Sequence, residues 1–157
     1  MTCAFSGTRE SLAVLRATAA WTRRLDVPLR VVTLGVRGRT MYPPEAGLDA
    51  EDMVLAAWLE QARREQEAAV AALTADGPLR EVTTAVAAGD GWADAVDRLD
   101  WDAREILVIG STRIGPVAQV FLGSRAVQLV RHAPVPALMV PDADSAAEVL
   151  ARAPEPG

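Results

Sequence analysis

The sequence predicts a single α/β domain in which five mostly parallel strands form a sheet with helices on both faces. Short apolar runs with the length and β-branched content of buried strands alternate with longer segments of helical periodicity. Strands and helices in alternation produce right-handed crossovers and a parallel sheet. The 157 residues, 50% hydrophobic and 24% charged, suit one globular domain with a substantial core.

The N-terminal third contains the first two predicted strands and the first helix. Cys3–Phe5 has the composition of a short buried strand, and Thr8 is placed to cap the helix that runs to about Leu25. Leu29–Val36, which reads LRVVTLGV, is mostly apolar and predicts the second buried strand. The segment Arg37–Gly47, with two glycines and a Pro-Pro pair, predicts a loop.

The middle of the chain predicts a long helix, a strand and a short third helix. Apolar residues at helical spacing extend from Glu51 to about Ala75, where Asp76-Gly77-Pro78 ends the helix. Arg80–Ala87 alternates as a strand does. Asp90 is expected to cap a third helix whose apolar face includes Trp92. The four tryptophans fall mostly on predicted helix faces, which favours packing in a core or interface over stacking on a ligand.

The last predicted elements surround a loop that contains glycine and proline. Ile106–Gly110 predicts a fourth strand, Ser111–Leu122 a loop, Ser124 to about His132 a fourth helix, and Ala137–Val140 a fifth strand. Residues 142–157 end in Ala-Pro-Glu-Pro-Gly, which is typical of a tail or linker. We therefore expect the domain to occupy residues 1–141.

This order of elements indicates where a ligand would bind. Open parallel sheets bind ligands outside the carboxyl ends of their strands, where the strand order reverses. The loops that follow Phe5, Val36 and Gly110 lie at such ends. The last of these loops leads into a helix N-terminus, whose free N–H groups and dipole favour a phosphate.

Composition and motif spacing argue against several classes of function. A net charge of −5 gives no support for nucleic-acid binding, and the single Cys3 and single His132 form neither a disulfide nor an ordinary zinc site. No apolar run reaches about 18 residues and no signal peptide opens the chain, so we expect a cytoplasmic protein without a membrane span. No catalytic triad, Walker lysine or pair of catalytic carboxylates can be assembled, and no catalytic or metal-binding residue is predicted.

Two blocks of residues resemble motifs of the universal stress protein family. Gly110-Ser111-Thr112 is followed after a spacer by Gly123-Ser124 and the run RAVQLVRHAPVPALMVP, which is similar to the family's C-terminal signature. The turn from Ser6 to Ser11 resembles the Asp-Gly-Ser-x-x-Ser turn that follows the family's first strand. The resemblance implies the Rossmann-like fold of the adenine nucleotide alpha hydrolases and binding of ATP, with magnesium, without turnover.

The resemblance also implies a set of site residues. The family's phosphate-and-ribose loop corresponds to Gly110, Gly123 and Ser124, and Leu34 lies roughly where the family's backbone contacts adenine. Hydroxyl and guanidinium groups that could reach a phosphate complete the set. The predicted site residues are Ser6, Leu34, Gly110, Ser111, Arg113, Gly123, Ser124 and Arg125.

Two of these residues depart from the family pattern. Arg113 stands where nucleotide-binding members have their second glycine, and Ser6 replaces their acidic residue. Arginine adopts positive φ less readily than glycine, so Arg113 either fills the site or binds phosphate after the loop rearranges. Replacing Arg113 by glycine separates the two roles, because a gain in affinity indicates obstruction and a loss indicates a phosphate ligand.

Three functions follow, in decreasing order of preference. The first is a stress-response domain that binds or senses an adenine nucleotide and forms a homodimer through the edge strand Ala137–Val140. The second is a regulatory or structural module that binds no nucleotide, such as one half of a tandem stress protein or a transporter-associated domain. The third is an enzyme that hydrolyses or transfers a nucleotide.

Overall fold

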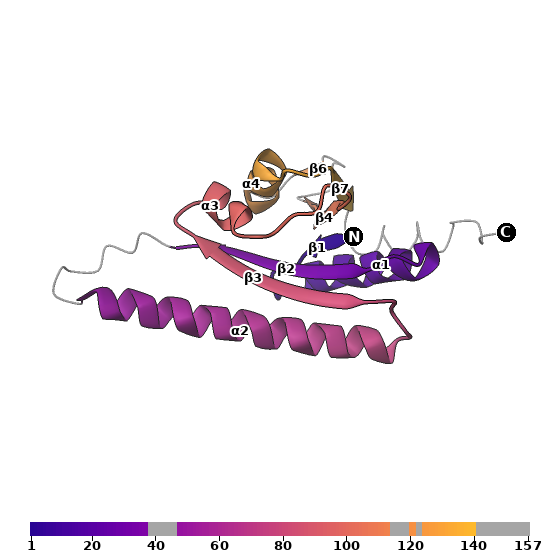
Figure 1. The fold of residues 1–157 in the computed structure, drawn as a ribbon, viewed down its shortest axis with the longest axis horizontal. Helices are drawn as coiled ribbons and strands as arrows, with labels where there is room; N and C mark the ends of the chain where they lie inside the picture. The colour runs from indigo at the N-terminus through magenta and orange to yellow at the C-terminus, as the bar shows by residue number, and fades with distance from the viewer. Residues whose placement is uncertain (38–46, 114–119, 122–123, 141–157) are drawn as a thin grey trace.

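A computed structural model describes residues 1–37, 47–113, 120–121 and 124–140, with backbone alone for 47–51, 112–113, 120–121 and 124. Figure 1 shows a central sheet with α1 and α2 on one face and α3 and α4 on the other. The elements are β1 (Thr2–Ala4), α1 (Arg9–Leu25), β2 (Leu29–Val36), α2 (Gly47–Ala75), β3 (Val82–Gly89), α3 (Trp92–Asp97), β4 (Leu107–Gly110), β5 (Thr112–Arg113), β6 (Val120–Phe121), α4 (Ser124–His132) and β7 (Ala137–Val140).

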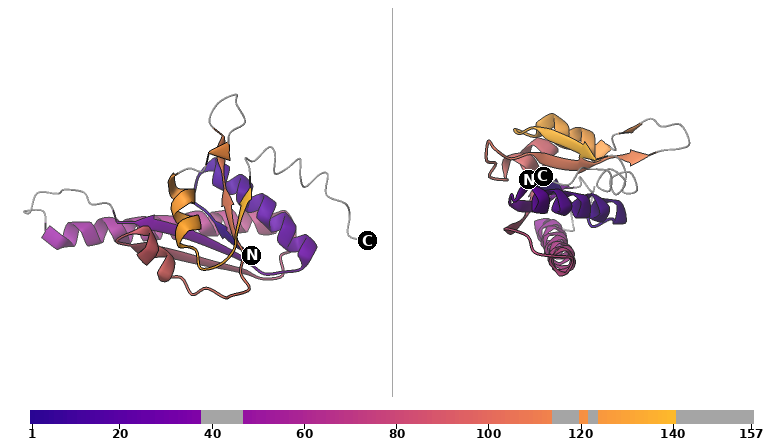
Figure 2. Two further views of the ribbon diagram at one scale, coloured as in Figure 1. Left: turned by 90° about the horizontal axis from the view of Figure 1, so that it is seen from above. Right: turned by 90° about the vertical axis from the view of Figure 1, so that its right-hand side faces the viewer.

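The main sheet confirms the predicted α/β architecture. Its five strands are parallel and follow the order β3-β2-β1-β4-β7, which Figure 2 shows from two further sides. The chain adds β2 and β3 on one side of β1, then crosses over to add β4 and β7 on the other. The strand order therefore reverses between β1 and β4, and a crevice opens there at the carboxyl ends of the strands.

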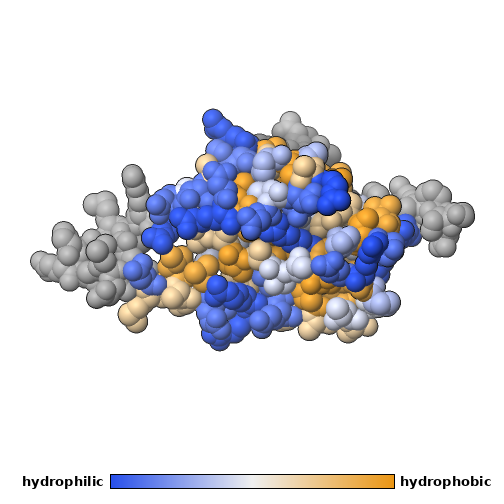
Figure 3. Space-filling view, viewed as in Figure 1, coloured by the Kyte–Doolittle hydropathy of each residue, from blue (hydrophilic) through white to orange (hydrophobic). Residues whose placement is uncertain are grey.

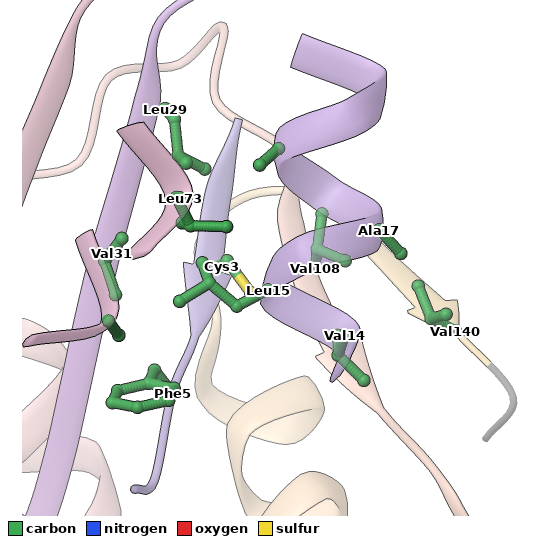
Figure 4. Close-up of a cluster of buried hydrophobic side chains, with 12 residues drawn as sticks. Cys3, Phe5, Val14, Leu15, Ala17, Leu29, Val31, Leu73, Val108 and Val140 are labelled. Atoms are coloured by element: carbon green, nitrogen blue, oxygen red, sulfur yellow. The ribbon is translucent and has the colours of Figure 1, made fainter. Parts of the chain in front are cut away.

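Two hydrophobic cores form, one on each face of the sheet. Side chains alternate along the strands, so Cys3 and Phe5 belong to the core under α1 and α2, while Ala4 faces α3 and α4. In the first core, shown in Figure 4, side chains from both helices and four strands converge around Cys3 and Leu15. The second core is built on Val32, Leu107 and Ile109. The surface in Figure 3 mixes hydrophilic and hydrophobic residues, as water-exposed surfaces do.

Helix α1 begins as the sequence predicts. The Thr8 hydroxyl accepts a hydrogen bond from the Ser11 N–H at 3.2 Å, which satisfies one of the free donors of the first turn. The helix ends at Leu25 and is capped by Asp26, whose φ of 50° places it in the left-handed region. Both ends of α1 are therefore fixed by local residues, and this fixes where the β1–α1 turn lies above the sheet.

Helix α2 contains a buried polar residue that the predicted apolar stripe did not include. The Gln66 side chain is 1% exposed, and its Nε2 donates to the Thr33 hydroxyl and to the Ala85 carbonyl, each at 2.9 Å. Buried amides require such partners. Gln66 thus ties α2 to both β2 and β3. The helix begins at Gly47, four residues before the predicted start, and most of the predicted loop before it lies outside the described residues.

Three sequence predictions need correction. Asp90 does not cap α3: the N-cap is Gly91, which makes no side-chain cap bond, and the Asp94 carboxylate instead accepts from the Asp90 N–H at 3.0 Å. Strand β3 runs two residues later than predicted because all eight of its residues pair in register with β2. The predicted loop after Ser111 is partly a two-stranded antiparallel ribbon of β5 and β6. The predicted tail, residues 142–157, lies outside the described part of the chain.

Candidate functional site

A cleft of about 620 Å³ opens at the carboxyl ends of β1 and β4. This is where the strand order reverses, and the volume lies within the roughly 300–1,000 Å³ of small-molecule sites. The structure brings together much of the site predicted from sequence. The predicted residues that line the cleft are Ser6, Leu34, Gly110, Ser111 and Arg125.

The other three predicted site residues are not tested by this geometry. Arg113 is placed by its backbone in β5, and Ser124 by its backbone as the first residue of α4. Gly123 lies outside the described residues. Their proposed contacts with phosphate and ribose stay predictions.

The wall of the cleft is apolar where it lies against the sheet and the helices. Ala4, Val32 and Leu34 line it from the sheet face that carries α3 and α4. Helix α3 contributes Trp92 and α4 contributes Leu129. Such a surface excludes water from an apolar group and offers it dispersion contacts.

The β1–α1 turn adds hydroxyl groups to the lining. The Ser6 and Thr8 hydroxyl oxygens lie 3.4 Å apart, and the Ser6 N–H donates to Ser11 Oγ at 3.3 Å. Ser11 Oγ in turn donates to the Thr8 carbonyl at 2.9 Å. Ser6 and Thr8 are exposed. The turn therefore presents polar groups to a ligand while its own backbone stays fixed.

The described lining holds one positive and one negative side chain. Arg125, in the first turn of α4, is exposed and makes no ion pair within the described residues. Glu10, in the first turn of α1, lines the cleft as well. A guanidinium beside a helix N-terminus is a favourable place for an anion, because both the side chain and the helix dipole attract it.

Gly110 lines the cleft, and close packing against α1 also requires a glycine at this position. A Cβ on Gly110 would lie 2.7 Å from Val14 Cγ2 of α1, closer than side chains normally approach. Absence of a side chain at this position thus lets α1 pack against the end of β4. The β1–α1 turn also needs glycine, because Gly7 has φ +73° and lies against the Glu65 carboxylate of α2.

Sequence reasoning missed several lining residues. Trp92, the first residue of α3, is half-buried and packs against the second core as predicted, but it also lines the cleft, which was not predicted. Ala126 and Leu129 lie three residues apart on the buried side of α4. Helical spacing identifies this side as apolar, but it does not reveal that part of it faces a cavity.

Electrostatics near the cleft fix α3 without creating a reactive group. The Arg98 guanidinium, followed by the Asp90 N–H, lowers the pKa of Asp94. The ionised Asp94 carboxylate therefore stabilises α3 at any pH above its ordinary pKa. This stabilisation is lost as the pH falls through the lowered pKa of the folded protein. Burial raises the pKa of the Cys3 thiol to about 12, so the thiol stays protonated at neutral pH. Within the described residues, no three His, Cys, Asp or Glu side chains are grouped to hold a metal ion.

Comparison with known sequences gives consistent matches. The family model described as universal stress protein family matches residues 1–141. A universal stress protein of Mycobacterium tuberculosis and one of Mycobacterium bovis are each 46% identical to the chain over 142 residues, 90% of its length. Those residues are 47% of each relative, so the chain spans about half the length of the curated relatives it matches.

Solved structures show the same fold. A universal stress protein from Archaeoglobus fulgidus matches with a TM-score of 0.59 and 22% identity, over 88% of this chain and 95% of that one. The UspA protein from Lactobacillus plantarum matches with a TM-score of 0.58 and 15% identity, over 89% and 97%. Among the described helices of this chain, none combines the length and apolar character needed to cross a membrane.

Proposed function

Because the chain belongs to the universal stress protein family, we propose that its cleft binds an adenine nucleotide, ATP with magnesium, and serves to sense it. The observation that carries this proposal is the cleft at the switch point between β1 and β4. Its volume suits a small ligand, and its lining combines apolar and polar parts. A nucleotide has the same two parts, an aromatic base and a charged phosphate chain.

The lining residues fit the two parts of the nucleotide. Leu34, Trp92 and Leu129 suit the base, which loses contact with water when it binds there. Arg125 and the N-terminus of α4 suit the phosphates, and the Ser6 and Ser111 side chains line the same cleft. Ser6 supplies neutral hydrogen bonding where nucleotide-binding members carry an acid.

We prefer sensing to turnover because the described lining has few side chains that could act as an acid, a base or a nucleophile. Its ionisable side chains are Glu10 and Arg125 alone, and the chain contains no lysine. Hydrolysis of a phosphate needs a group that positions or deprotonates the attacking water. A protein that holds ATP without such a group reports its presence through its own stability and contacts.

Arg125 provides the first test. Calorimetric titration should show that Arg125→Ala weakens ATP binding about tenfold, because a charge-assisted hydrogen bond is lost at an exposed position. Adenosine, which lacks phosphates, should bind the variant and the wild type equally. The matched control is Arg131→Ala, which removes an exposed arginine of the same helix that does not line the cleft. Equal loss in both variants would show that Arg125 acts only through general charge.

The alternative function is a module that binds no nucleotide. Ser6 in place of the family's acidic residue and Arg113 in place of its second glycine favour this function, in which the domain would be, for example, one half of a tandem stress protein or a transporter-associated domain. The wild-type titration distinguishes the two functions. Binding of ATP supports the sensor, and no binding at millimolar ATP supports the module.

We also propose that the protein forms a homodimer through β7. This strand pairs with β4 on one side and is the last strand of the described sheet, so its other edge is open for pairing. Leu138 of β7 is 38% exposed, and Val127 and Val130 of α4 are each 43% exposed. Apolar side chains beside an open edge suit an isologous contact between two copies.

Replacing Leu138 by arginine should convert the dimer to a monomer in sedimentation velocity. A charge on the open edge would have to be desolvated when two copies pair, which disfavours association. Leu25→Arg is the matched control, since Leu25 is 60% exposed at the end of α1 and is not part of the open strand edge. A wild type that sediments as a monomer would contradict the proposed dimer.

A further inference from the structure

We propose that Trp92 is the residue that recognises the nucleotide base, through stacking of its indole ring on the purine. The inference rests on the proposed nucleotide binding and adds to it a specificity for purine over pyrimidine bases. Its starting point is the place of Trp92 at the first position of α3, on the sheet face where the apolar part of the cleft lies.

Trp92 differs from the other tryptophans of the chain in its contacts. The Trp101 indole N–H donates to the Val96 carbonyl at 2.9 Å, and its ring lies under the Arg30 guanidinium at 5.9 Å. Trp58 packs against Gly35, and Trp21 packs against the core on the opposite face. These three side chains have structural roles.

The Trp92 ring is half-buried and its indole N–H makes no hydrogen bond within the described part of the chain. One part of the side chain packs against the second core, and another lines the cleft. A tryptophan usually satisfies its N–H when it is buried. Trp92 therefore offers a ligand both an aromatic surface and an available donor.

The surroundings of Trp92 complete a site for a flat apolar group. Leu34 of β2 and Leu129 of α4 line the same cleft, and α3 contacts both β2 and α4. Figure 1 shows α3 and α4 on the same face of the sheet. An aromatic ring held among these side chains gains apolar burial as well as stacking.

The start of α3 is held in place independently of any ligand. A Cβ on Gly89 would collide with the backbone N of Ala95, so the end of β3 and the first turn of α3 lie in close contact. The Asp94 carboxylate accepts from the Asp90 N–H at 3.0 Å and from Arg98 Nε at 3.0 Å. These contacts fix the turn from which Trp92 projects. A fixed aromatic surface loses little conformational entropy when a base stacks on it.

Purines gain more from such a surface than pyrimidines do, because two fused rings offer more stacking area than one. Stacking of a base on an aromatic side chain affects affinity by about tenfold or more. Trp92 should therefore contribute to the preference for ATP over UTP. The phosphates of both nucleotides would interact alike with Arg125.

Titrations of the full chain with ATP, UTP and inorganic tripolyphosphate test the inference. Trp92→Leu should bind ATP about tenfold more weakly, with a smaller ATP-to-UTP preference and unchanged tripolyphosphate binding. Trp92→Phe should keep most of the affinity. ATP should quench tryptophan fluorescence in the wild type and in the control Trp21→Phe, and should cause no quenching in Trp92→Phe. Thermal unfolding verifies that each variant is folded.

The outcomes separate this inference from the proposed function. If the wild type binds ATP and Trp92→Leu keeps both the affinity and the ATP-to-UTP preference, the role of Trp92 is overturned and nucleotide binding stands. Persistent quenching in Trp92→Phe overturns stacking in the same way. If the wild type binds no ATP, both proposals are overturned.

Discussion

Replacing Ala126 by phenylalanine should lower the affinity for ATP by about 100-fold, or about 2.7 kcal/mol. Ala126 is 6% exposed and lines the cleft from α4, so a ring at this position occupies space that the base needs. Because Ala126 belongs to the second core as well as to the lining, the added ring should also destabilise the protein, by about 1–3 kcal/mol. Isothermal titration calorimetry measures the affinity, and thermal unfolding measures the stability.

The matched control for Ala126→Phe is the adjacent residue of the same helix. Val127 is 43% exposed and does not line the cleft, so Val127→Phe adds the same ring to the outside of α4. ATP should bind this variant as it binds the wild type. Unchanged ATP binding by a folded Ala126→Phe protein would place the nucleotide site elsewhere.

Replacing Gly110 by alanine should destabilise the protein by about 1–3 kcal/mol, because the new Cβ approaches Val14 of α1. Adding Val14→Ala removes the crowding methyl groups, so the double variant should be more stable than the sum of the two single changes predicts. Chemical denaturation of the four proteins gives the coupling. A coupling near zero would contradict the packing role of Gly110.

Gly91→Ala is the matched control for this cycle. A Cβ at Gly91 has no atom within 4 Å, and its φ of −157° is open to any residue. Alanine is a poorer N-cap than glycine, so this change should cost no more than about 1 kcal/mol. The double variant Gly110→Ala with Val14→Ala should also be titrated with ATP. If it recovers both the stability and the ATP affinity that Gly110→Ala loses, the glycine serves the site by positioning α1 and β4.

The fold was predictable because its signals are local and repeated. Leu29–Val36 and Ile106–Gly110 are short and mostly apolar, with many β-branched residues, which is typical of strands inside a parallel sheet. Thr8 and the residues after it give the start of α1 through the hydroxyl and N–H groups of one turn. Alternation of such strands with helices then fixes a parallel arrangement by the handedness of the crossovers.

Features that depend on partners distant in sequence were not predictable. Gln66 is polar within an apolar helix face, and its role becomes apparent only when Thr33 and Ala85 are placed beside it. The start and end of β3 are set by its pairing with β2, because each of its eight residues pairs with one residue of β2. Asp90 has the residue type of an N-cap, but in the structure its backbone N–H donates to the carboxylate of Asp94, which lies within α3.

The candidate site also has a part that the sequence predicts and a part that it does not. Family motifs pointed to Gly110 and to the turn that holds Ser6, and Arg125 was added because its positive charge stands at a predicted helix N-terminus; all three line the cleft. Trp92 could not be assigned from sequence, since a tryptophan on a helix face looks the same whether it faces a core or a cavity. The structure confirms that Trp92 packs against the second core and adds that it also lines the cleft.

The unfolding temperature of the wild-type protein, with and without ATP and magnesium, tests the proposed nucleotide site most directly. A ligand that binds only the folded state at 100 times its dissociation constant stabilises it by about 2.7 kcal/mol. We therefore expect the unfolding temperature to rise with ATP concentration in the wild type, and the same rise in Ala126→Phe to need about 100 times more ATP. An unfolding temperature that does not change at millimolar ATP would contradict nucleotide binding in this cleft.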